Sequence, residues 1–529
     1  MIRLLFFLLV IIADAEARTA IQWHPTELQF EVNRSIPHPL GVKFGAVFRG
    51  PEQSRLTVPG FWDGGRTFKI RFTPTLPGTW TYRTYASEAS LKGKEGTFKV
   101  ETSHSTNPLF RHGGFLQVSA NRHYLTYTDG TPFFWLGDTW WFCPGRRCPI
   151  NRLSNPKIGS MYKHMVDVRA EQGYTTALML FAGHSPTFLY PGQWDESYLR
   201  NWRFVDSYIS YANQKGLIPV LGTGFHKALD KVPLSQLKLL WRYLIARYGA
   251  YAVGWLIVGE YNFQNDGRRV AKVDELGEYI KKLDPYKRAM SVHPWLYTKE
   301  KRQLWDRPWY DFIMVQGGHG YPPPIKYYLS IFNRPPAKPF LETEARYEGI
   351  FNAGPDDVRH AAYRAIQTGS FGYTYGSHGL WLPLLYPDEK IPSLEAWGKA
   401  LPWWQALKRP GAEQMGYLRR FYESLSWWNM APRPGQVIDN IGDDDKRRVL
   451  VKSDGVRWWA VYFPRYLDAS HPVRLQEMPQ GVYAGKWFDP RLGVFASLPK
   501  ALSPASGGYL TLPARPAGSD WLLVLEKVR

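Results

Sequence analysis

Eight short apolar runs, most of them closed by a polar or charged side chain, constrain the fold of this 529-residue chain more than any other feature. The runs are Pro132–Asp138, Thr175–Leu180, Leu217–Gly222, Trp255–Glu260, Ala289–His293, Phe312–Gln316, Pro339–Glu344 and Gly372–Tyr375. Segments with helical periodicity separate them, so the middle of the chain alternates strand and helix eight times. This alternation predicts an α/β fold, a (β/α)8 TIM barrel, whose functional groups gather at the carboxyl ends of the strands.

Two of the intervening helices each show one apolar face. The first face comprises Leu237, Leu240, Trp241, Leu244, Ile245 and Tyr248, and the second comprises Val270, Val273, Leu276, Tyr279, Ile280 and Leu283. The spacing of three and four residues is that of the buried side of a helix. Asp284-Pro285 should end the second helix, because the residue before a proline disfavours helical geometry.

The segment before the barrel, residues 18–105, has β patterning. Apolar and basic residues alternate in Phe68–Phe72, as in a half-buried strand. Pro77-Gly78 predicts a turn, and Trp80–Tyr82 alternates again, which suggests that the two strands form a hairpin. We expect an immunoglobulin-like β-sandwich here.

The barrel itself should occupy residues 114–410. From about Gly411 the helical periodicity fades and short apolar strands return. Pro, Gly and Asp turns separate these strands, so residues 411–529 are predicted to form a C-terminal β-sandwich. We expect both flanking sandwiches to brace the barrel, since neither shows a distinct set of ligand-binding residues.

The N-terminus has the pattern of an export signal. Arg3 precedes the apolar run Leu4–Ile12, and the small residues of Ala13–Ala17 follow it. This predicts a signal peptide over residues 1–17 and a secreted or periplasmic protein. Nine apolar residues are too few to cross a bilayer, and no cysteine follows for lipid attachment, so we expect no membrane partner.

The formal net charge is +20, and it becomes +21 when the loss of residues 1–17 removes one basic and two acidic side chains. Such a charge favours polyanionic partners, among them nucleic acid and uronate-rich polysaccharide. The basic residues are scattered, so an ordinary solvated basic surface is the alternative. For an exported protein we expect an acidic glycan rather than nucleic acid, and we expect the chain to act as a monomer.

Two glutamates stand where a barrel carries its chemistry. Glu260 ends the fourth run and Glu344 ends the seventh. A pair of carboxylates across a barrel mouth is what the hydrolysis of a glycosidic bond requires. Apolar neighbours should raise the pKa of Glu260, which suits a general acid, and leave Glu344 as the nucleophile. The alternative for Glu260 is a buried carboxylate paired with a basic side chain.

The seventh run also contains Glu342, two residues before Glu344. Both side chains should point to the same side of the strand, and Glu344 should lie nearer the mouth. Glu342 is expected to lie one layer deeper and hold a strand-end network, although it remains the second candidate for the nucleophile. A retaining mechanism needs carboxyl groups about 5–5.5 Å apart and an inverting one about 6.5–9.5 Å, which a sequence does not reveal.

Polar and aromatic residues near other strand ends are candidates for substrate binding. They are Asp138, Trp140, Trp141, His184, His293, Gln316, His319, Tyr375, His378 and Trp381. Asp138 could instead be a structural carboxylate that accepts hydrogen bonds from loop N–H groups. The histidines lack the spacing of a metal site, so we expect no metal and no cofactor.

Only two cysteines are present, Cys143 and Cys148, in the loop after the first barrel strand. In an exported protein a pair this close should form one small disulfide that pins the loop. Two thiols alone would not complete a zinc site.

Several motifs together resemble the apiosidase-like glycoside hydrolases. In the barrel they are Phe134-Trp-Leu-Gly-Asp-Thr-Trp-Trp141, Met314-Val-Gln-Gly-Gly-His319, Glu344-Ala-Arg-Tyr-Glu-Gly349 and Phe371-Gly-Tyr-Thr-Tyr-Gly376. The front end, Phe61-Trp-Asp-Gly-Gly65 to Pro77-Gly-Thr-Trp80, is similar to the β-sandwich that often precedes such barrels. The tail, with Trp487-Phe-Asp-Pro-Arg491, is similar to a C-terminal sandwich of the collagen-binding type.

This resemblance implies a (β/α)8 enzyme of the kind associated with bacterial degradation of plant pectin. The catalytic pair of the family then falls on Glu260 and Glu344. The family pattern has aspartate at the fourth-strand position, where this chain carries Glu260, so the resemblance implies the reaction class rather than apiose as the sugar. The alternative is a non-catalytic carbohydrate- or matrix-binding protein. A collagen-cleaving protease is disfavoured, because the sequence has no zinc motif and no recognisable nucleophile setting.

Overall fold

An eight-stranded parallel sheet forms the centre of the computed structural model, which describes residues 18–151, 153–155, 158–181, 196–299, 302–438 and 444–529. Its strands are β12 (Trp135–Trp140), β15 (Thr176–Leu180), β16 (Ile218–Gly222), β17 (Gly254–Gly259), β18 (Met290–His293), β19 (Ile313–Val315), β20 (Phe340–Glu342) and β21 (Gly372–Tyr375). They are hydrogen-bonded in the order β18-β17-β16-β15-β12-β21-β20-β19. The two end strands, β18 and β19, contact each other, so the ring is nearly closed. The predicted (β/α)8 barrel is confirmed.

Helices surround the barrel. The longer ones are α2 (Met161–Glu171), α3 (Glu196–Gln214), α5 (Leu234–Tyr248), α6 (Gly267–Leu283), α7 (Ile325–Phe332) and α8 (Pro355–Gln367), and α4 (Lys227–Lys231) is short. Helices α5 and α6 are the two whose apolar faces the sequence shows, and α6 ends at Leu283, before Asp284-Pro285. Most residues of the two apolar faces are buried, as the periodicity predicts, including Leu237, Leu244 and Ile280, and Val270, Tyr279 and Leu283 are half-buried.

The first barrel strand differs from its predicted range. Pro132–Phe133 forms a separate strand, β11, in a small sheet with β10 (Leu125–Thr126) and β9 (Gln117–Val118). The barrel strand β12 then begins at Trp135 and continues to Trp140, so Asp138 lies inside the strand rather than at its end. All six residues of β12 are buried, which is why the apolar pattern alone did not locate its ends.

The N-terminal segment folds into two packed sheets. One has the order β1-β8-β7-β3-β4 and the other β2-β6-β5. The strands are β1 (Arg18–Ile21), β2 (Thr26–Glu31), β3 (Phe44–Arg49), β4 (Arg55–Pro59), β5 (Phe61–Trp62), β6 (Thr67–Phe72), β7 (Gly78–Ala86) and β8 (Glu95–Glu101). The aromatic core between the sheets includes Phe48, Phe72 and Trp80.

The predicted hairpin between the strands at Phe68–Phe72 and Trp80–Tyr82 is wrong. These residues lie in β6 and β7, which belong to different sheets of the sandwich. The connection is held against the barrel instead, because the Thr73 hydroxyl donates to the carbonyl of Ala250 and the Tyr286 hydroxyl accepts from the Thr73 N–H. A tertiary contact therefore overrides a local turn signal.

A buried ion-pair network joins this sandwich to the barrel. Arg71 of β6 and Arg247 of α5 both contact Asp206 of α3 at 2.7 Å, and Arg247 also contacts Asp63 at 2.8 Å. Burial on its own raises the pKa of Asp206, but the two guanidinium groups lower it to about 2. The alternation in Phe68–Phe72 predicts a half-buried strand, but Arg71 is buried as well, because the barrel covers that face of the sheet.

After the barrel, helix continues further than predicted. Helix α11 spans Pro410–Glu423 and packs against α8, with Met415, Leu418 and Phe421 buried. Pro410-Gly411 resembles a turn signal, but proline is also favourable at the first position of a helix. Two short helices, α9 (Pro392–Glu395) and α10 (Trp403–Ala406), precede it.

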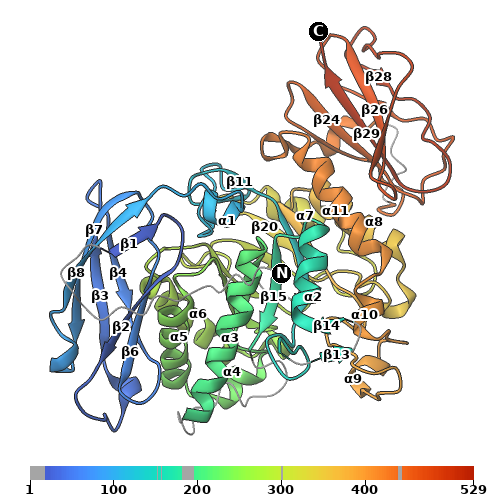
Figure 1. Cartoon of the computed structure of the whole chain (residues 1–529). Coiled ribbons are helices and arrows are strands. Elements are labelled where there is room, and N and C mark those ends of the chain that lie inside the picture. The colour runs from blue at the N-terminus through green and yellow to red at the C-terminus, as the bar shows by residue number, and fades with distance from the viewer. Residues whose placement is uncertain (1–17, 152, 156–157, 182–195, 300–301, 439–443) are drawn as a thin grey trace.

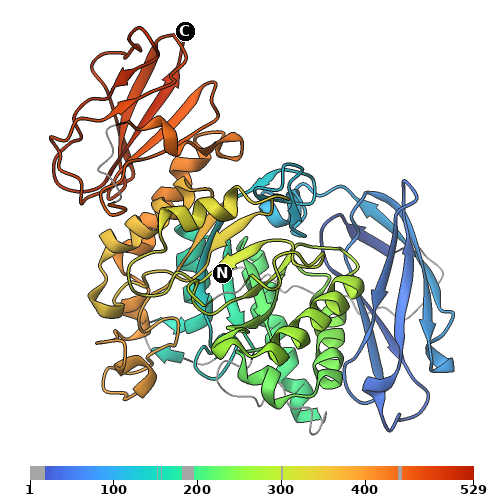
Figure 2. The ribbon, with the colours of Figure 1, turned by 180° about the vertical axis from the view of Figure 1, so that it is seen from behind.

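The C-terminal segment is an antiparallel β structure. A six-stranded sheet has the order β22-β23-β24-β29-β26-β27, and a two-stranded sheet pairs β25 with β28. Their bounds are β22 (Ala431–Pro432), β23 (Leu450–Ser453), β24 (Trp458–Phe463), β25 (Arg474–Leu475), β26 (Tyr483–Asp489), β27 (Val494–Ser497), β28 (Leu510–Thr511) and β29 (Trp521–Lys527). Figures 1 and 2 show the two sandwiches on opposite sides of the barrel.

Within the described residues no helix is both long enough and apolar enough to cross a membrane. Residues 1–17, for which a signal peptide is predicted, lie outside the described residues.

Candidate active site

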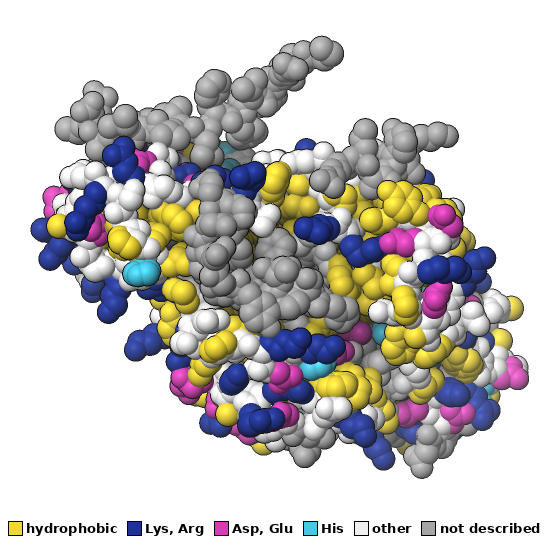
Figure 3. All heavy atoms as spheres, turned by 90° about the horizontal axis from the view of Figure 1, so that it is seen from below, with side chains coloured by type: hydrophobic (Ala, Val, Ile, Leu, Met, Phe, Trp, Pro, Cys, Tyr) yellow, Lys and Arg dark blue, Asp and Glu magenta, His cyan; other side chains and the backbone are white. Residues whose placement is uncertain are grey.

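The carboxyl ends of the barrel strands bring several polar side chains together. His293 is the last residue of β18, Gln316 directly follows β19, Glu260 directly follows β17, and Glu344 lies two residues beyond β20. Because the strands are parallel neighbours in one sheet, these positions meet at one end of the barrel. The loops at this end, around α4 and α9, lie at the bottom of Figure 1. Figure 3 views the molecule from that side and shows histidine and acidic side chains among hydrophobic ones.

Glu344 is a buried carboxylate that two histidines hold. Its Oε2 lies 2.9 Å from Nε2 of His293, and its Oε1 lies 3.4 Å from Nε2 of His319. Burial alone would raise the pKa of Glu344, but the hydrogen bonds and charges of the two histidines lower it to about 2. Glu344 is therefore ionised throughout the neutral range, as a nucleophile must be.

The hydrogen bonds of His293 define how it holds Glu344. Its Nε2 faces an ionised carboxylate, so Nε2–H is the donor in that contact. The other ring nitrogen, Nδ1, lies 3.1 Å from the hydroxyl of Thr343, which can donate or accept. The ring of Trp141 packs at 5.2 Å from that of His293. His293 is wholly buried, so the orientation of its ring is set by these three contacts.

Glu260 has a different environment. Its side chain is 22% exposed, Gln316 donates from Nε2 to its Oε1 at 3.4 Å, and Nδ1 of His226 lies 3.8 Å from its Oε2. Burial is the main cause that raises the pKa of Glu260 to about 7, and the negative charge of Glu344 adds to it. Glu260 therefore holds a proton over much of the acidic and neutral range.

The backbone at Glu260 is strained. Its φ angle is 53°, in the left-handed region that residues with a side chain rarely adopt. Such a conformation costs on the order of 1–2 kcal/mol and is often found at functional sites. Here the turn directly follows β17, and it carries the Glu260 carboxyl to the side chain of Gln316.

The pKa values of the two glutamates are thus shifted in opposite directions, down for Glu344 and up for Glu260. The charge of Glu344 is one cause of the raised pKa of Glu260, so the carboxyl groups are close enough to interact through space. A carboxylate with a low pKa beside a carboxyl with a raised pKa is the arrangement that separates nucleophile from general acid.

Glu342, the second candidate for the nucleophile, is fully occupied by structural hydrogen bonds. Its Oε1 accepts from the backbone N–H groups of Gly317 and Glu344, at 3.0 and 3.1 Å. Its Oε2 accepts from the Tyr328 hydroxyl at 2.6 Å. Burial raises the pKa of Glu342 to about 7, against the effect of these donors. With no exposed surface, Glu342 joins the ends of β19 and β20 to helix α7.

Four of the residues predicted to bind substrate lie around the two glutamates. Gln316 contacts Glu260 and also accepts from the N–H of Leu296 at 2.8 Å. His319 contacts Glu344, and Trp141 packs against His293. His293 itself makes a fourth.

Three others are buried in contacts with side chains other than the two glutamates. Asp138 pairs with the buried Arg169 at 2.7 Å and accepts from the indole N–H of Trp140 at 2.9 Å. Tyr375 donates to Glu348 at 2.7 Å. Asp138, Trp140 and Tyr375 are all wholly buried, so none presents surface to a ligand in this structure. For Asp138 the geometry matches the structural alternative, since it also accepts from the backbone N–H of Thr139.

The remaining predicted residues lie in loops or outside the described part. His378 is buried, with Nε2 3.1 Å from the carbonyl oxygen of Gly398. Trp381 is partly buried and packs beside Phe142, with ring centroids 6.3 Å apart. His184 lies outside the described residues.

Aromatic side chains that the sequence did not single out flank both glutamates. On the Glu260 side, the ring of Phe263 stacks on His226 at 4.4 Å and lies tilted against Trp295 at 4.5 Å. On the Glu344 side, Trp397 packs at 5.1 Å from His319 and at 5.2 Å from Phe351, which is 55% exposed. These residues lie in irregular loops, where no periodicity marks a position as functional.

The two cysteines are joined by a disulfide in the loop after β12. Arg147, inside this loop, pairs with Glu389 at 2.7 Å and donates to the carbonyl oxygen of Pro383 at 2.9 Å. The disulfide loop is thereby tied to the segment after β21. Across the ranges that the structure describes, no group of three or more His, Cys, Asp or Glu side chains is arranged to hold a metal ion.

Comparison with known proteins gives two family matches. Residues 119–429 match the model of the apiosidase-like catalytic domain. Residues 19–87 match a domain of unknown function, DUF5060. No curated protein matches the chain.

Solved structures share the fold at low sequence identity. A protein from Bacteroides vulgatus that is named a putative glycoside hydrolase aligns with a TM-score of 0.71 and 17% identity, over 97% of this chain and all of the other. A family 5 glycoside hydrolase from the same organism aligns with a TM-score of 0.66 and 20% identity, over 81% of this chain and 95% of the other. A third glycoside hydrolase has a TM-score of 0.65 and 21% identity, over 78% and 97% of the two chains.

Proposed function

The chain belongs to the apiosidase-like family and is a glycoside hydrolase, and from this premise we propose that Glu260 and Glu344 are its catalytic pair. The observation that carries the proposal is the contrast between their surroundings: two histidines contact Glu344, whereas Glu260 lies beside Gln316, with His226 at 3.8 Å. The two histidines lower the pKa of Glu344 to about 2, while burial and the charge of Glu344 raise the pKa of Glu260 to about 7. Membership of an enzyme family also favours hydrolysis over the alternative of a non-catalytic binding protein.

We propose a retaining double displacement. The carboxylate of Glu344 attacks the anomeric carbon while the proton of Glu260 moves to the glycosidic oxygen, so the C–O bond breaks and the aglycone leaves neutral. A glycosyl ester of Glu344 remains. Glu260, now ionised, then takes a proton from water as the water oxygen attacks the anomeric carbon, which releases the sugar and restores both carboxyls.

The electrostatics of the pair fit the change of role at Glu260. When Glu344 becomes an ester, it loses the negative charge that helps to raise the pKa of Glu260. The pKa of Glu260 therefore falls in the intermediate, where it must act as a base. His293 and His319 orient Glu344 and donate to it before attack, and their hydrogen bonds weaken as its charge is consumed.

We also propose the class of substrate. The net charge of +20 supports an acidic glycan of plant or microbial origin, with pectin-related polymers as the first candidates. The aromatic rings beside each glutamate, above all Trp397 and Trp295, are placed to pack on sugar rings.

The N-terminal pattern supports a secreted or periplasmic enzyme. We propose that it acts as a monomer.

The test is hydrolysis of a panel of plant glycans and aryl glycosides by the wild type and by Glu344→Gln. We expect the wild type to release sugar from at least one member and the variant to lose activity by a factor on the order of 10³ or more. The matched control is Glu342→Gln, two residues away, which should keep most of the activity because its partners are structural. Full activity of Glu344→Gln would reject the proposed nucleophile.

A further inference from the structure

The outer face of the N-terminal five-stranded sheet forms a hollow of about 770 Å³. Strand alternation creates this face, because Trp80, Tyr82 and Thr84 of β7 point into the sandwich while Arg83 and Tyr85 point out. Figure 1 places β7 and β8 on the side of the sandwich away from the barrel. The hollow is therefore separate from the two glutamates at the barrel mouth.

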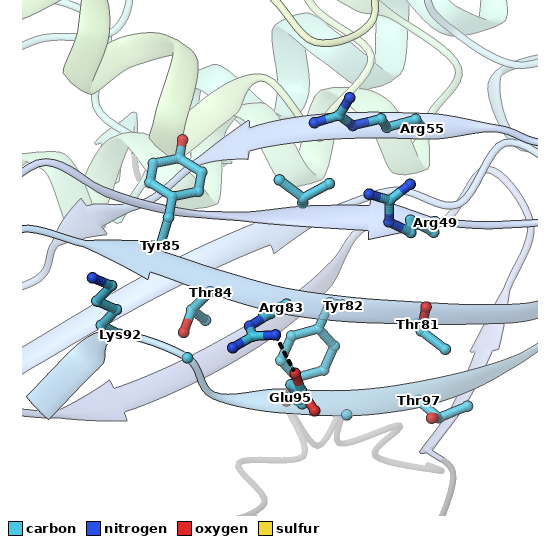
Figure 4. A pocket seen from close by; sticks show the side chains of 13 residues that line it. Arg49, Arg55, Thr81, Tyr82, Arg83, Thr84, Tyr85, Lys92, Glu95 and Thr97 are labelled. Atoms are coloured by element: carbon cyan, nitrogen blue, oxygen red, sulfur yellow. Dashed lines mark ion pairs between the residues drawn. The ribbon is translucent and has the colours of Figure 1, made fainter.

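Positive charge dominates the hollow. Its lining includes Arg49, Arg55, Arg83 and Lys92, but only one carboxylate, Glu95 (Figure 4). Arg83 and Glu95 lie 3.3 Å apart with side chains 73% and 62% exposed, so their pairing is weak.

Arg49 and Arg55 stand directly opposite each other in the ladder between β3 and β4. Like charges in this position destabilise a pair of strands. Within the described part of the chain, neither guanidinium pairs with a carboxylate. Glu52, in the turn between the two strands, pairs with neither of them. Folding gains nothing from two unpaired arginines side by side, whereas an anionic ligand between them would remove the repulsion.

The rest of the lining suits an extended polar polymer. Thr81 is paired with Arg49 across β3 and β7 and with Thr97 across β7 and β8, so both threonine hydroxyl groups lie at the Arg49 end of the hollow (Figure 4). Tyr85, 37% exposed, offers one ring face. The cations are spread over strands β4, β3 and β7, so the site matches charges that repeat along a chain better than a single small anion.

The chemistry of the lining favours a carboxylated polysaccharide over other polyanions. Guanidinium groups bind planar carboxylates through two parallel hydrogen bonds. A concave hollow does not fit a flat lipid surface, and one exposed aromatic ring is a poor platform for the stacked bases of single-stranded nucleic acid. A glycosidase, moreover, works on polysaccharide.

We propose that this sheet face, lined by Arg49, Arg55, Arg83 and Lys92, binds a carboxylate-bearing polysaccharide. The bound polymer holds the enzyme close to further glycosidic bonds, which raises the effective concentration of substrate at the barrel without any contact to the reacting atoms. Only the choice of polysaccharide over other polymers rests on the proposed function. The binding itself is measured separately from hydrolysis.

The test compares binding of polygalacturonate to full-length proteins that all carry Glu344→Gln, so that the polymer is not consumed. Arg49→Gln/Arg55→Gln should weaken the affinity at least tenfold. The matched control, Arg34→Gln/Lys500→Gln, removes the same charge from exposed sites outside the hollow and should bind like the parent. Fully methyl-esterified polygalacturonate, which is neutral, should not bind to any of them.

Two further measurements keep the outcome decisive. In the wild-type background, Arg49→Gln/Arg55→Gln should hydrolyse a small aryl glycoside normally and unfold at the same temperature or higher, since it removes a repulsion. Equal affinity of Arg49→Gln/Arg55→Gln and the control would overturn the proposal. Undiminished binding of the methyl ester, or tighter binding of a DNA oligonucleotide in the hollow, would overturn it as well. If Glu344→Gln remained active, Glu344 would be rejected as the nucleophile, but the measured difference in affinity for polygalacturonate would still support the binding site.

Discussion

At the scale of single residues, Glu342 and Glu344 show how two carboxyl groups on one strand end acquire different properties. Both are buried, yet the pKa of Glu342 is raised to about 7 and that of Glu344 is lowered to about 2. The difference is the partner. Glu342 meets neutral donors and no cation, whereas Glu344 meets two histidines.

The raised pKa of Glu342 predicts a pH-dependent stability. Above its ordinary pKa of 4.5 the unfolded chain releases this proton, while the folded chain keeps it until about pH 7. Stability is therefore lost as the pH rises through this window, by about 3 kcal/mol for a shift of this size. Glu342→Gln cannot ionise, and its amide can serve the same partners. In urea unfolding, we expect the free energy of unfolding of Glu342→Gln to rise relative to that of the wild type between pH 5 and pH 8. An equal difference between the two proteins at both pH values would contradict this account.

The raised pKa of Glu260 predicts the pH above which activity falls on the alkaline side of the rate profile. The general acid must carry its proton, so kcat/KM should fall tenfold per pH unit above about pH 7. The hydrogen bond from Gln316 lowers the pKa of Glu260, so Gln316→Met should move this limb to higher pH. Gln214→Met, at the surface of α3, is the control and should leave it in place. A limb that stays fixed in Gln316→Met would mean that another group sets it.

The positions of the site residues could be predicted from the sequence better than their roles. Strand-end positions were enough to place Glu260, Glu344, His293 and Gln316 in one cluster. The sequence could not distinguish Asp138 from a ligand-facing carboxylate, because the partner that neutralises it, Arg169, is remote in sequence and contributed by another element. The aromatic rings of Trp295 and Trp397 were missed since loop conformation, which no period encodes, brings them to the site.

At the scale of elements, the loop after β12 is shaped by a covalent bond and an ion pair. The disulfide closes a loop of sequence separation 5, and Arg147 binds the segment after β21. Trp141, which packs on His293, directly follows β12 and lies two residues before Cys143.

Removal of the disulfide should destabilise the protein modestly. Closure of so short a loop is worth about 2 kcal/mol in the chain-entropy model. We expect Cys143→Ser/Cys148→Ser to lower the urea midpoint accordingly and to reduce activity through misplacement of Trp141. Two controls are measured beside the variant: the untreated wild type, with the disulfide intact, and the wild type kept in reducing agent. An unchanged midpoint in both the variant and the reduced wild type would show that Arg147 alone holds the loop.

Elements with one buried face were predictable, and elements that depend on distant partners were not. Helices α5 and α6 follow from their apolar spacing. The false hairpin between β6 and β7 had a good local turn, but the barrel holds Thr73 and separates the strands into two sheets. Helix α11 escaped notice because its Pro-Gly start resembles a turn.

At the scale of the whole molecule, buried arginines join the flanking sandwiches to the barrel. On the C-terminal side, Arg359 of α8 is wholly buried and lies 2.6 Å from Asp520, next to β29. It also donates to Gln414 of α11 and to Ser519. On the N-terminal side, Arg71 and Arg247 share Asp206.

Loss of Arg359 should weaken the junction with the C-terminal sandwich. Arg359→Met leaves the carboxylate of Asp520 buried and without its cation, which costs about 3–5 kcal/mol. Calorimetry should show a lower or a separate transition for the C-terminal sandwich. Arg359→Met/Asp520→Asn removes both charges and should recover part of the loss. If Arg359→Met unfolds like the wild type, the junction depends on apolar packing alone.

The most direct test of the catalytic assignment is to trap the intermediate. The wild type would be incubated with the 2-deoxy-2-fluoro glycoside of whichever sugar the panel identifies, then digested and mapped by mass spectrometry, while NMR follows the anomer released from the ordinary substrate. The proposed mechanism predicts one glycosyl unit attached to the peptide at Glu344 and a product of retained configuration. An inverted product without any adduct, or an adduct on Glu342, would contradict it.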